Sequence, residues 1–223
     1  MGLLSKKNTD GDEMVFDFHF PTSKKALIIF TRNPELGQCK TRLAKVLGDE
    51  AALNIYVYLL QHTAQVSEGV NADKYVFYSE HIKNNDFWNP DIFRKKLQSG
   101  TDLGSRMENA FSELFNMGYQ KVMIIGSDLL DLEQQQIEHA FEHLDSHDIV
   151  IGPSKDGGYY LLGMKIMHSD IFRNKDWGTE TVLSATLNDL QKSHVKLLEE
   201  LNDIDTFEDM KHYKQLERFY TLI

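Results

Sequence analysis

The sequence lacks the features that are typical of disulfide-rich, membrane-spanning and secreted proteins. It contains one cysteine, Cys39, among 223 residues, so a framework of disulfide bonds is excluded. No stretch approaches the run of about 20 apolar residues that spans a bilayer, so we expect no membrane insertion. Residues 1–24 lack a small-residue cleavage site after a long apolar core, so no secretory leader is expected. We expect a cytoplasmic protein.

Positive charge is also scarce. The chain has 24 Lys and Arg against 34 Asp and Glu, which gives a formal net charge of −10. Nonspecific binding to a nucleic acid duplex needs a basic face that displaces counterions. Nucleic acid is therefore not an expected partner.

What the sequence does contain is an alternation of short apolar runs with helical patterns. Such alternation is typical of βαβ units, which build a mainly parallel sheet with helices on both faces. The sequence has no internal repeat and no low-complexity linker, which favours one α/β domain over residues 25–223. We expect its strands at residues 26–30, 74–79, 121–127, 148–152, 159–164 and 194–198.

Residues 1–24 are predicted to form an N-terminal extension of this domain. A polar stretch is followed by Met14, Phe16, Phe18 and Phe20, which alternate with mixed residues. This alternation fits either an additional edge strand or an appended segment.

Several polar residues are predicted to begin helices. Asp102 precedes a helix with Met107, Ala110, Phe111 and Leu114 on one face, and Gly118 suits a left-handed C-terminal cap. We expect three further N-caps, at Asp131 with Gln134 in the manner of a capping box, at Thr179, and at Thr206.

Ligands in such sheets bind beyond the carboxyl ends of the strands, so the polar residues that follow strands are candidates for a site. After the first strand, residues 31–42 form a glycine-containing loop that ends in Lys40 and Arg42. Backbone N–H groups and two cations in such a loop suit a pyrophosphate. The loop lacks both the Walker A pattern and the dinucleotide fingerprint, and a solvated loop with incidental charges fits the pattern equally well.

Carboxylates follow two later strands. Asp128 lies at the end of an apolar strand, where it is well placed to hold a divalent cation that binds phosphate oxygens. Asp203 and Asp205 form an Asp-x-Asp before the last helix, which suits a metal but is also common at helix starts. Two aromatic residues, Tyr159 and Trp177, could stack on a base or sugar, although isolated aromatics are more typical of packing.

Taken together, six segments resemble one family. They are LIIF at 27–30, PELGQCKTRL at 34–43, QSGTDLGSRM at 98–107, IGSD at 125–128, GPSKDGGYYLLG at 152–163 and DIDTFED at 203–209. In this order they resemble the bacterial radical-SAM/selenodomain-associated transferases of the nucleotide-diphospho-sugar transferase superfamily. The likeness runs from about Lys25 to Met210 and implies a glycosyltransferase-A-like fold.

The resemblance also implies a ligand and a metal. Members of the superfamily bind a nucleotide or nucleotide sugar with a divalent cation, Mg²⁺ or Mn²⁺, across the carboxyl edge of the sheet. The matching positions here that would contact or lie near the nucleotide are Gly37, Lys40, Arg42, Asp102, Gly104 and Arg106. The positions that would hold the metal are Asp128 and Asp205.

Two departures from the family pattern affect the metal loops. The family often has Asp-x-Pro-Asp after the metal strand, where this chain has Asp128-Leu129-Leu130-Asp131. Its late Thr-Pro-Glu-Asp is Thr206-Phe207-Glu208-Asp209 here. Loss of these prolines changes the stiffness of the loops rather than the ligands.

Three functional hypotheses follow. The first is glycosyl transfer from a nucleotide-diphosphate sugar to an unknown small-molecule acceptor, with Asp156 or Glu180 as general base. The alternative is nucleotidyl transfer to a phosphorylated small molecule, which needs the same nucleotide pocket, metal and cations. The second alternative is a non-catalytic protein that binds nucleotides or sugars, because a fold does not determine a function.

Overall fold

The protein folds around one twisted sheet. We describe a computed structural model over residues 2–7, 13–18 and 20–220. The main sheet has seven strands in the order β5-β4-β3-β6-β8-β7-β9. Their bounds are β3 Lys25–Thr31, β4 Asp73–Tyr78, β5 Phe93–Leu97, β6 Lys121–Ile125, β7 Ile149–Pro153, β8 Tyr159–Met164 and β9 Val195–Leu197. All adjacent strands pair in parallel except where β8 pairs antiparallel with both β6 and β7.

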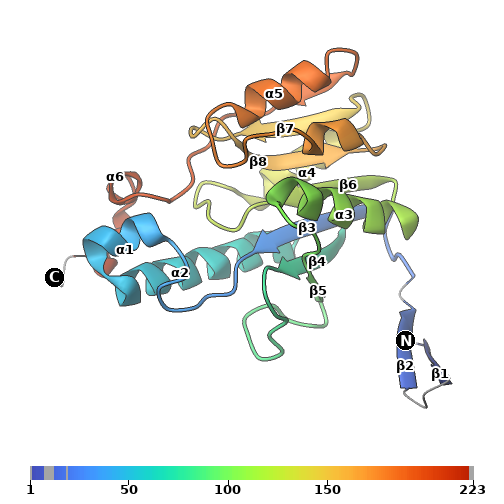
Figure 1. Cartoon of the computed structure of the whole chain (residues 1–223), viewed down its shortest axis with the longest axis horizontal. Helices are drawn as coiled ribbons and strands as arrows, with labels where there is room; N and C mark the ends of the chain where they lie inside the picture. Colours follow the sequence, from blue (N-terminus) through green and yellow to red (C-terminus); the bar gives the residue numbers. More distant parts are fainter. Residues whose placement is uncertain (1, 8–12, 19, 221–223) are drawn as a thin grey trace.

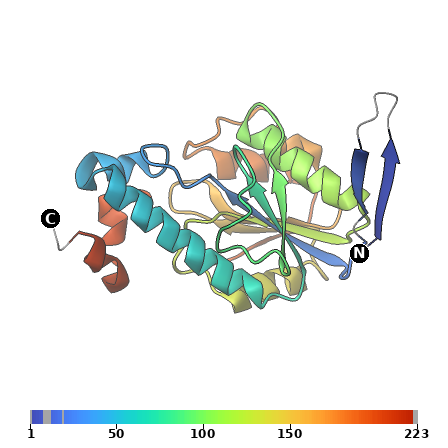
Figure 2. The ribbon, with the colours of Figure 1, turned by 90° about the horizontal axis from the view of Figure 1, so that it is seen from below.

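Helices cover both faces of this sheet (Figures 1 and 2). On one face lie α2 (Asp49–Glu68) and α4 (Gln134–His143), and on the other lie α3 (Leu103–Asn116), the 3₁₀ helix η1 (Ser169–Phe172) and α5 (Val182–Asp189). The predicted α/β architecture, a mainly parallel sheet between two helical layers, is confirmed.

Alternation along each central strand produces the two cores. In β3, Leu27 and Ile29 pack toward α2 and α4, while Ala26 and Ile28 pack toward α3. Because successive side chains of a strand point to opposite faces, a strand covered on both sides is apolar throughout. This explains why the buried central strands lack an apolar–polar alternation.

A third apolar cluster joins the C-terminal segment to the start of the domain. The short helix α1 (Thr41–Leu47) and α2 pack against α6 (Phe207–Met210) and the 3₁₀ helix η2 (Lys214–Phe219). In Figure 2 these elements lie at the end of the molecule opposite the N-terminal strands. The last helices are therefore anchored beside the loop that follows β3.

The N-terminal residues form a separate two-stranded antiparallel sheet. Its strands are β1 (Gly2–Lys7) and β2 (Glu13–Phe18), with Leu4 opposite Phe16. The alternation at 14–18 is therefore a strand, but it does not extend the main sheet. Thr22 and Ser23 donate their backbone N–H groups to the Asp73 carboxylate, which ties the following segment to β4.

Of the four predicted helix starts, two are confirmed and two are displaced. Asp102 caps α3, Thr206 caps α6, and Gly118 has a φ of 98°. The predicted caps at Asp131 and Thr179 are wrong, because α4 begins at Gln134 and α5 at Val182.

The capping partners explain the first displacement. The backbone N–H of Glu133 donates to Gln136 Oε1 at 2.7 Å, two residues after the predicted pair. Asp131 instead accepts a hydrogen bond from the Tyr213 hydroxyl of the C-terminal segment. The Asp131 carboxylate, which the local sequence predicted as a helix cap, therefore binds a residue that is distant in sequence instead.

Candidate nucleotide and metal site

The strand order reverses between β3 and β6, and the main cleft opens there. From β3 the chain continues outward through β4 and β5 and then returns to β6 on the other side. Ligands of open α/β sheets bind at such a switch point, beyond the carboxyl ends of the strands. A cleft of about 1080 Å³ lies at this place, lined by the loop after β3, the residues after β4 and β6, the start of α3, and Asp205.

Lys40 is the centre of the polar contacts in the cleft. Its Nζ lies 3.0 Å from Asp128 Oδ2 and 3.5 Å from Asp205 Oδ1, and its side chain is only 6% exposed. Burial by itself lowers the pKa of Lys40, but the attraction of the two carboxylates outweighs burial and the pKa is raised. The ammonium group therefore stays protonated between the two residues predicted to hold a metal.

The backbone of Lys40 is held in the left-handed region, with φ 49° and ψ 46°. This conformation is uncommon for a residue with a Cβ and costs roughly 1–2 kcal/mol. Strain of this kind is found at functional sites, where surrounding contacts hold it in place.

Arg42 completes the pairing on the solvent side. Its Nη1 donates to Asp205 Oδ2 at 2.7 Å, and its own side chain is mostly exposed. Arg42 thus keeps a cation at the mouth of the cleft that a phosphate can reach.

The C-terminal segment reaches this site through its own backbone. The N–H of Ile204 donates to the carbonyl oxygen of Asp128 at 3.0 Å, and the Ile204 side chain is fully buried in the third cluster. The Asp209 carboxylate accepts from the backbone N–H groups of Asp205 and Thr206. These contacts explain how residues far apart in sequence present their carboxylates to one lysine.

Asp102 and Arg106 also line the cleft. Ser105 N–H donates to Asp102 Oδ1 at 2.9 Å, and this bond is the main cause that lowers the pKa of Asp102. Arg106 donates from Nε to the Gly100 carbonyl and from Nη1 to Gln98 Oε1, at 3.2 and 3.4 Å. Both side chains border the cleft and both also have structural contacts, and their predicted place near a nucleotide stays a prediction.

Two predicted glycines do not line the cleft. Gly37 has a φ of 74°, which a glycine adopts without strain. A Cβ at Gly104 would lie 2.3 Å from the Phe172 carbonyl oxygen and 2.6 Å from Trp177 Nε1. Gly104 is therefore placed by the packing of α3 against the segment before α5.

A second, smaller cavity of about 270 Å³ adjoins the cleft. Asp156 lines it and accepts hydrogen bonds from the Ser154 hydroxyl and from the Gly158 N–H, the latter at 2.9 Å. Glu180, the other predicted general base, is exposed and lines neither cavity. Its backbone packs against Gly157, where a Cβ would lie 2.4 Å from the Glu180 Cα.

Asp203 is a residue of the site whose importance the sequence indicated only weakly. It lines the smaller cavity, and burial, followed by the negative charges of Asp128 and Asp156, raises its pKa to about 6. The Asp-x-Asp pattern was the available signal. Helix capping explained that pattern equally well until the fold placed Asp203 near two other carboxylates.

Among the other lining residues, Gln98 lies in a segment that carries the resemblance but was given no role, and two aromatics were named only as stacking candidates. Gln98 donates to the carbonyl oxygens of Thr31 and Phe77 and so contacts both β3 and β4 at the cleft. Trp177 borders the smaller cavity and also makes an edge contact with Tyr159, with ring centroids 6.4 Å apart. Sequence favoured packing for both aromatics, and the structure gives them packing and a place on the cavity wall.

The family follows from a profile match over residues 62–179, just over half of the chain. The chain belongs to the DUF2064 family of uncharacterized proteins conserved in bacteria. The narrower resemblance to radical-SAM/selenodomain-associated proteins stays a prediction.

A curated relative is the 2-phospho-L-lactate guanylyltransferase of Methanocaldococcus jannaschii. It is 25% identical over 142 residues, which are 63% of this chain and 60% of that protein. The chain thus spans less than two thirds of the length of the relative that it matches.

Solved structures share the fold. A presumed nucleotide-diphospho-sugar transferase from Desulfovibrio desulfuricans G20 is 29% identical with a TM-score of 0.81, over 88% of this chain and 95% of that one. The 4-diphosphocytidyl-2C-methyl-D-erythritol synthase of Anaerococcus prevotii is 12% identical with a TM-score of 0.57, over 87% and 96%. Rv0371c of Mycobacterium tuberculosis, in complex with manganese, is 11% identical with a TM-score of 0.53, over 86% and 97%. The predicted nucleotide-diphospho-sugar transferase fold is confirmed.

One further expectation concerned membranes. Within residues 2–7, 13–18 and 20–220, no helix has the length and apolar character needed to cross a bilayer.

Proposed function

We propose that this protein transfers a nucleotidyl group from a nucleoside triphosphate to the phosphate of a small molecule. The guanylyltransferase relative supports this alternative better than the glycosyl transfer that we expected first. The observation that carries the proposal is the convergence of Lys40 and Arg42 with Asp128 and Asp205 at the switch point of the sheet. That set combines phosphate-binding cations with the carboxylates of a divalent metal.

In the proposed reaction, an oxygen of the acceptor phosphate attacks the α-phosphorus of the triphosphate. A new P–O bond forms, the bond from the α-phosphorus to the bridging oxygen breaks, and pyrophosphate leaves with the electron pair. Negative charge grows on the leaving group, so fixed cations that meet it lower the barrier. Lys40, Arg42 and Arg106 line the cleft and supply those cations.

This chemistry does not require a general base. A phosphate monoester has its second pKa near 6, so the attacking oxygen is already anionic at neutral pH. Asp156 and Glu180, predicted as bases for an acceptor hydroxyl, have no proton to remove in this reaction. We assign Asp156 to the acceptor side of the site instead.

The carboxylates fit a divalent cation. Asp128 and Asp205 both face one cation position, because each lies within 3.5 Å of the same ammonium nitrogen. Among the residues that the structure describes, no three His, Cys, Asp or Glu side chains form a metal site, so phosphates and water would supply the other ligands of Mg²⁺ or Mn²⁺. A bound ion would stabilise the charge of the α-phosphate and of the departing pyrophosphate.

The test measures which product leaves. We would incubate the protein and Mg²⁺ with each of the four nucleoside triphosphates and a panel of phosphorylated small molecules, and measure pyrophosphate. Parallel reactions with nucleotide sugars would measure nucleoside diphosphate. Release of pyrophosphate that depends on the acceptor supports the proposal. Release of nucleoside diphosphate from a nucleotide sugar, without pyrophosphate from any triphosphate, contradicts it.

A matched pair of variants localises the effect. Arg42→Ala removes a cation that lines the cleft, and we expect kcat/KM for the triphosphate to fall by about 10- to 100-fold. Lys45→Ala removes a cation from the same helix, but Lys45 is exposed and outside the cleft, so kcat/KM should stay unchanged. Equal losses in both variants would argue against a specific phosphate contact at Arg42.

A further inference from the structure

The smaller cavity continues the main cleft beyond Asp128. Phe30, Leu103, Gly126 and Asp128 line both spaces, so a molecule in one can touch a molecule in the other. A volume of about 270 Å³ is too small for a nucleoside triphosphate and is ample for a compound of a few carbon atoms. With a nucleotide in the cleft, the adjoining smaller cavity offers a place for the body of an acceptor.

Charge is divided unequally between the two spaces. The described cations of the site, Arg32, Lys40, Arg42 and Arg106, all line the cleft. Among the residues that the structure describes, no lysine or arginine lines the smaller cavity, whereas Asp128, Asp156 and Asp203 all border it. Cationic side chains for an anionic group therefore line the cleft, where Lys40 also pairs with the shared residue Asp128, and the smaller cavity keeps the carboxylates of Asp156 and Asp203.

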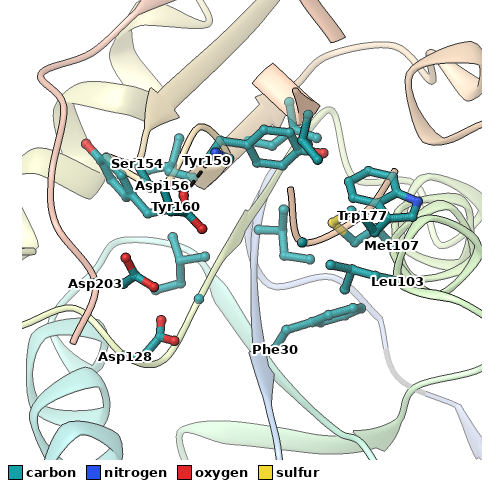
Figure 3. A pocket seen from close by; sticks show the side chains of 18 of the residues that line it. Phe30, Leu103, Met107, Asp128, Ser154, Asp156, Tyr159, Tyr160, Trp177 and Asp203 are labelled. Carbon is teal, nitrogen blue, oxygen red and sulfur yellow. Dashed lines mark hydrogen bonds between the residues drawn. The ribbon is translucent and has the colours of Figure 1, made fainter. Parts of the chain in front are cut away.

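The walls of the smaller cavity differ from one side to the other (Figure 3). In this view the carboxylates lie together on one side. The opposite side carries apolar side chains, those of Phe30, Leu103, Met107 and Trp177. A ligand that fits both sides has hydrogen-bond donors at one end and a hydrocarbon group at the other.

We propose that the acceptor is a phosphate monoester whose body is uncharged, bears a hydroxyl group and an apolar group, and has no carboxylate. This inference rests on the proposed function and narrows its substrate class. A hydroxyl group can donate to Asp156 or Asp203, and the apolar group packs against Trp177 and Leu103. A carboxylate placed beside Asp156 and Asp203 would be removed from water next to like charges, away from the cations that line the cleft, which costs free energy.

The experiment compares two acceptors that differ only at the carboxylate. One is 2-phospho-L-lactate, and the other is propane-1,2-diol 2-phosphate, in which a hydroxymethyl group replaces the carboxylate. Pyrophosphate release by the full-length protein with Mg²⁺ gives kcat/KM for each. We expect the uncharged acceptor to be preferred by at least about tenfold.

A longer acceptor tests the apolar wall. Pentane-1,2-diol 2-phosphate adds two methylene groups, and we expect its KM to be about tenfold lower than that of the propane compound. Trp177→Ala should reduce this gain while leaving the KM of the triphosphate within about twofold, because Trp177 lines the smaller cavity and not the cleft. Leu103→Ala should also reduce the gain, and since Leu103 lines both spaces, only the ratio between the two acceptors is compared for this variant. Leu103 is 44% exposed, so this variant folds even if the loss of Trp177 disturbs packing.

One charge variant tests the acidic wall. Asp156→Asn keeps an oxygen that can accept from Ser154 and Gly158 but removes one negative charge. We expect it to improve kcat/KM for 2-phospho-L-lactate by several-fold relative to the uncharged acceptor. Asp176→Asn is the matched control, because Asp176 is exposed and does not line the cavity.

Three outcomes are distinct. Preference for the uncharged acceptors, weakened by Asp156→Asn, supports the inference. Equal or better use of 2-phospho-L-lactate by the unaltered protein overturns the inference and leaves nucleotidyl transfer standing. Absence of pyrophosphate with every acceptor and every triphosphate overturns the proposed function and this inference with it.

Discussion

The ammonium group of Lys40 lies between two carboxylates, those of Asp128 and Asp205, and reduces the repulsion between them. Both carboxylates form ion pairs with this ammonium group, and the Lys40 side chain is almost fully buried. A divalent cation held by the same two carboxylates would compete with this ammonium. The triphosphate offers Lys40 another anion, so metal and nucleotide should bind with positive coupling.

We therefore expect Lys40→Ala to change metal and nucleotide binding in opposite directions. Without nucleotide, the variant should bind Mn²⁺ about tenfold more tightly than the unaltered protein, because its competing ammonium is gone. Its affinity for the triphosphate should fall by a similar factor. Calorimetric titration measures both affinities, with Lys45→Ala as control. Weaker Mn²⁺ binding by Lys40→Ala would contradict the competition.

Asp203 gives a pH dependence of stability whose sign follows from its raised pKa. The folded protein holds this proton up to about pH 6, whereas the unfolded chain releases it near its ordinary value of 3.8. Between these pH values the folded state binds more protons, so the free energy of unfolding falls as pH rises. Above about pH 6 the destabilisation is constant.

Asp203→Asn should remove this destabilisation. In metal-free buffer at pH 7.5, we expect the variant to be more stable by on the order of 1 kcal/mol, a discounted value because the side chain is partly exposed. The gain should shrink from pH 6 toward pH 4. Chemical denaturation across this range measures it, and a gain that is constant with pH would show that Asp203 is not its source.

The types of residue in the sequence predicted where the site lies better than they predicted what each residue does there. Lys40, Arg42, Asp128 and Asp205 follow strands, and the topology brings such positions to one edge, so their meeting in the cleft was predictable. Their direct pairing was not, because it depends on the backbone contact from Ile204 to Asp128. A backbone hydrogen bond between residues so far apart in the sequence cannot be predicted from local sequence patterns.

At the scale of elements, buried strands were predicted well and an edge strand was missed. β6 is apolar and buried from Val122 to Ile125 because it is covered on both faces. The edge strand β5 has the sequence Phe-Arg-Lys-Lys-Leu. Lysines at a sheet edge disfavour pairing with other chains. They also interrupt the apolar pattern by which a strand is predicted. The seven-residue helix α1 was missed as well, because it has a single fully buried side chain, Leu43.

The close contact between α3 and the segment before α5 depends on a glycine, Gly104, which has no side chain. Gly104 lies within the first turn of α3, where glycine is unfavourable for the helix itself. We expect Gly104→Ala to lower stability by about 1–3 kcal/mol, because its Cβ would displace the Phe172 carbonyl and the Trp177 ring.

Thermal unfolding and tryptophan fluorescence check this expectation. Ser112→Ala, on the same helix, is the control, and its melting temperature should change little. A Gly104→Ala protein with the stability and the fluorescence of the unaltered chain would show that α3 has room at this position.

At the scale of the whole molecule, the segment before β3 is bound to the domain. Asp73 is only 6% exposed and accepts from the Thr22 hydroxyl, from the Thr22 and Ser23 N–H groups, and from the Tyr119 hydroxyl. The predicted boundary at 24 therefore separates Asp73 from part of its hydrogen bonds.

Truncation at two positions tests this boundary. A chain that lacks residues 1–19 should unfold at the temperature of the full-length protein. A chain that lacks residues 1–24 leaves Asp73 short of partners and should lose about 1–3 kcal/mol of stability. Equal melting temperatures for the two truncated chains would show that Thr22 and Ser23 add nothing to the domain.

The strand β8, which runs antiparallel to both of its neighbours in the main sheet, has a consequence for how the molecule can change. Because β8 starts where β7 ends, the turn between them lies at the same edge as the cleft. Residues 154–182 supply most of the wall of the smaller cavity and none of the wall of the cleft. One uninterrupted stretch of the gene therefore encodes most of one compartment, and replacing that stretch as a cassette would remodel it while the neighbouring compartment keeps its lining.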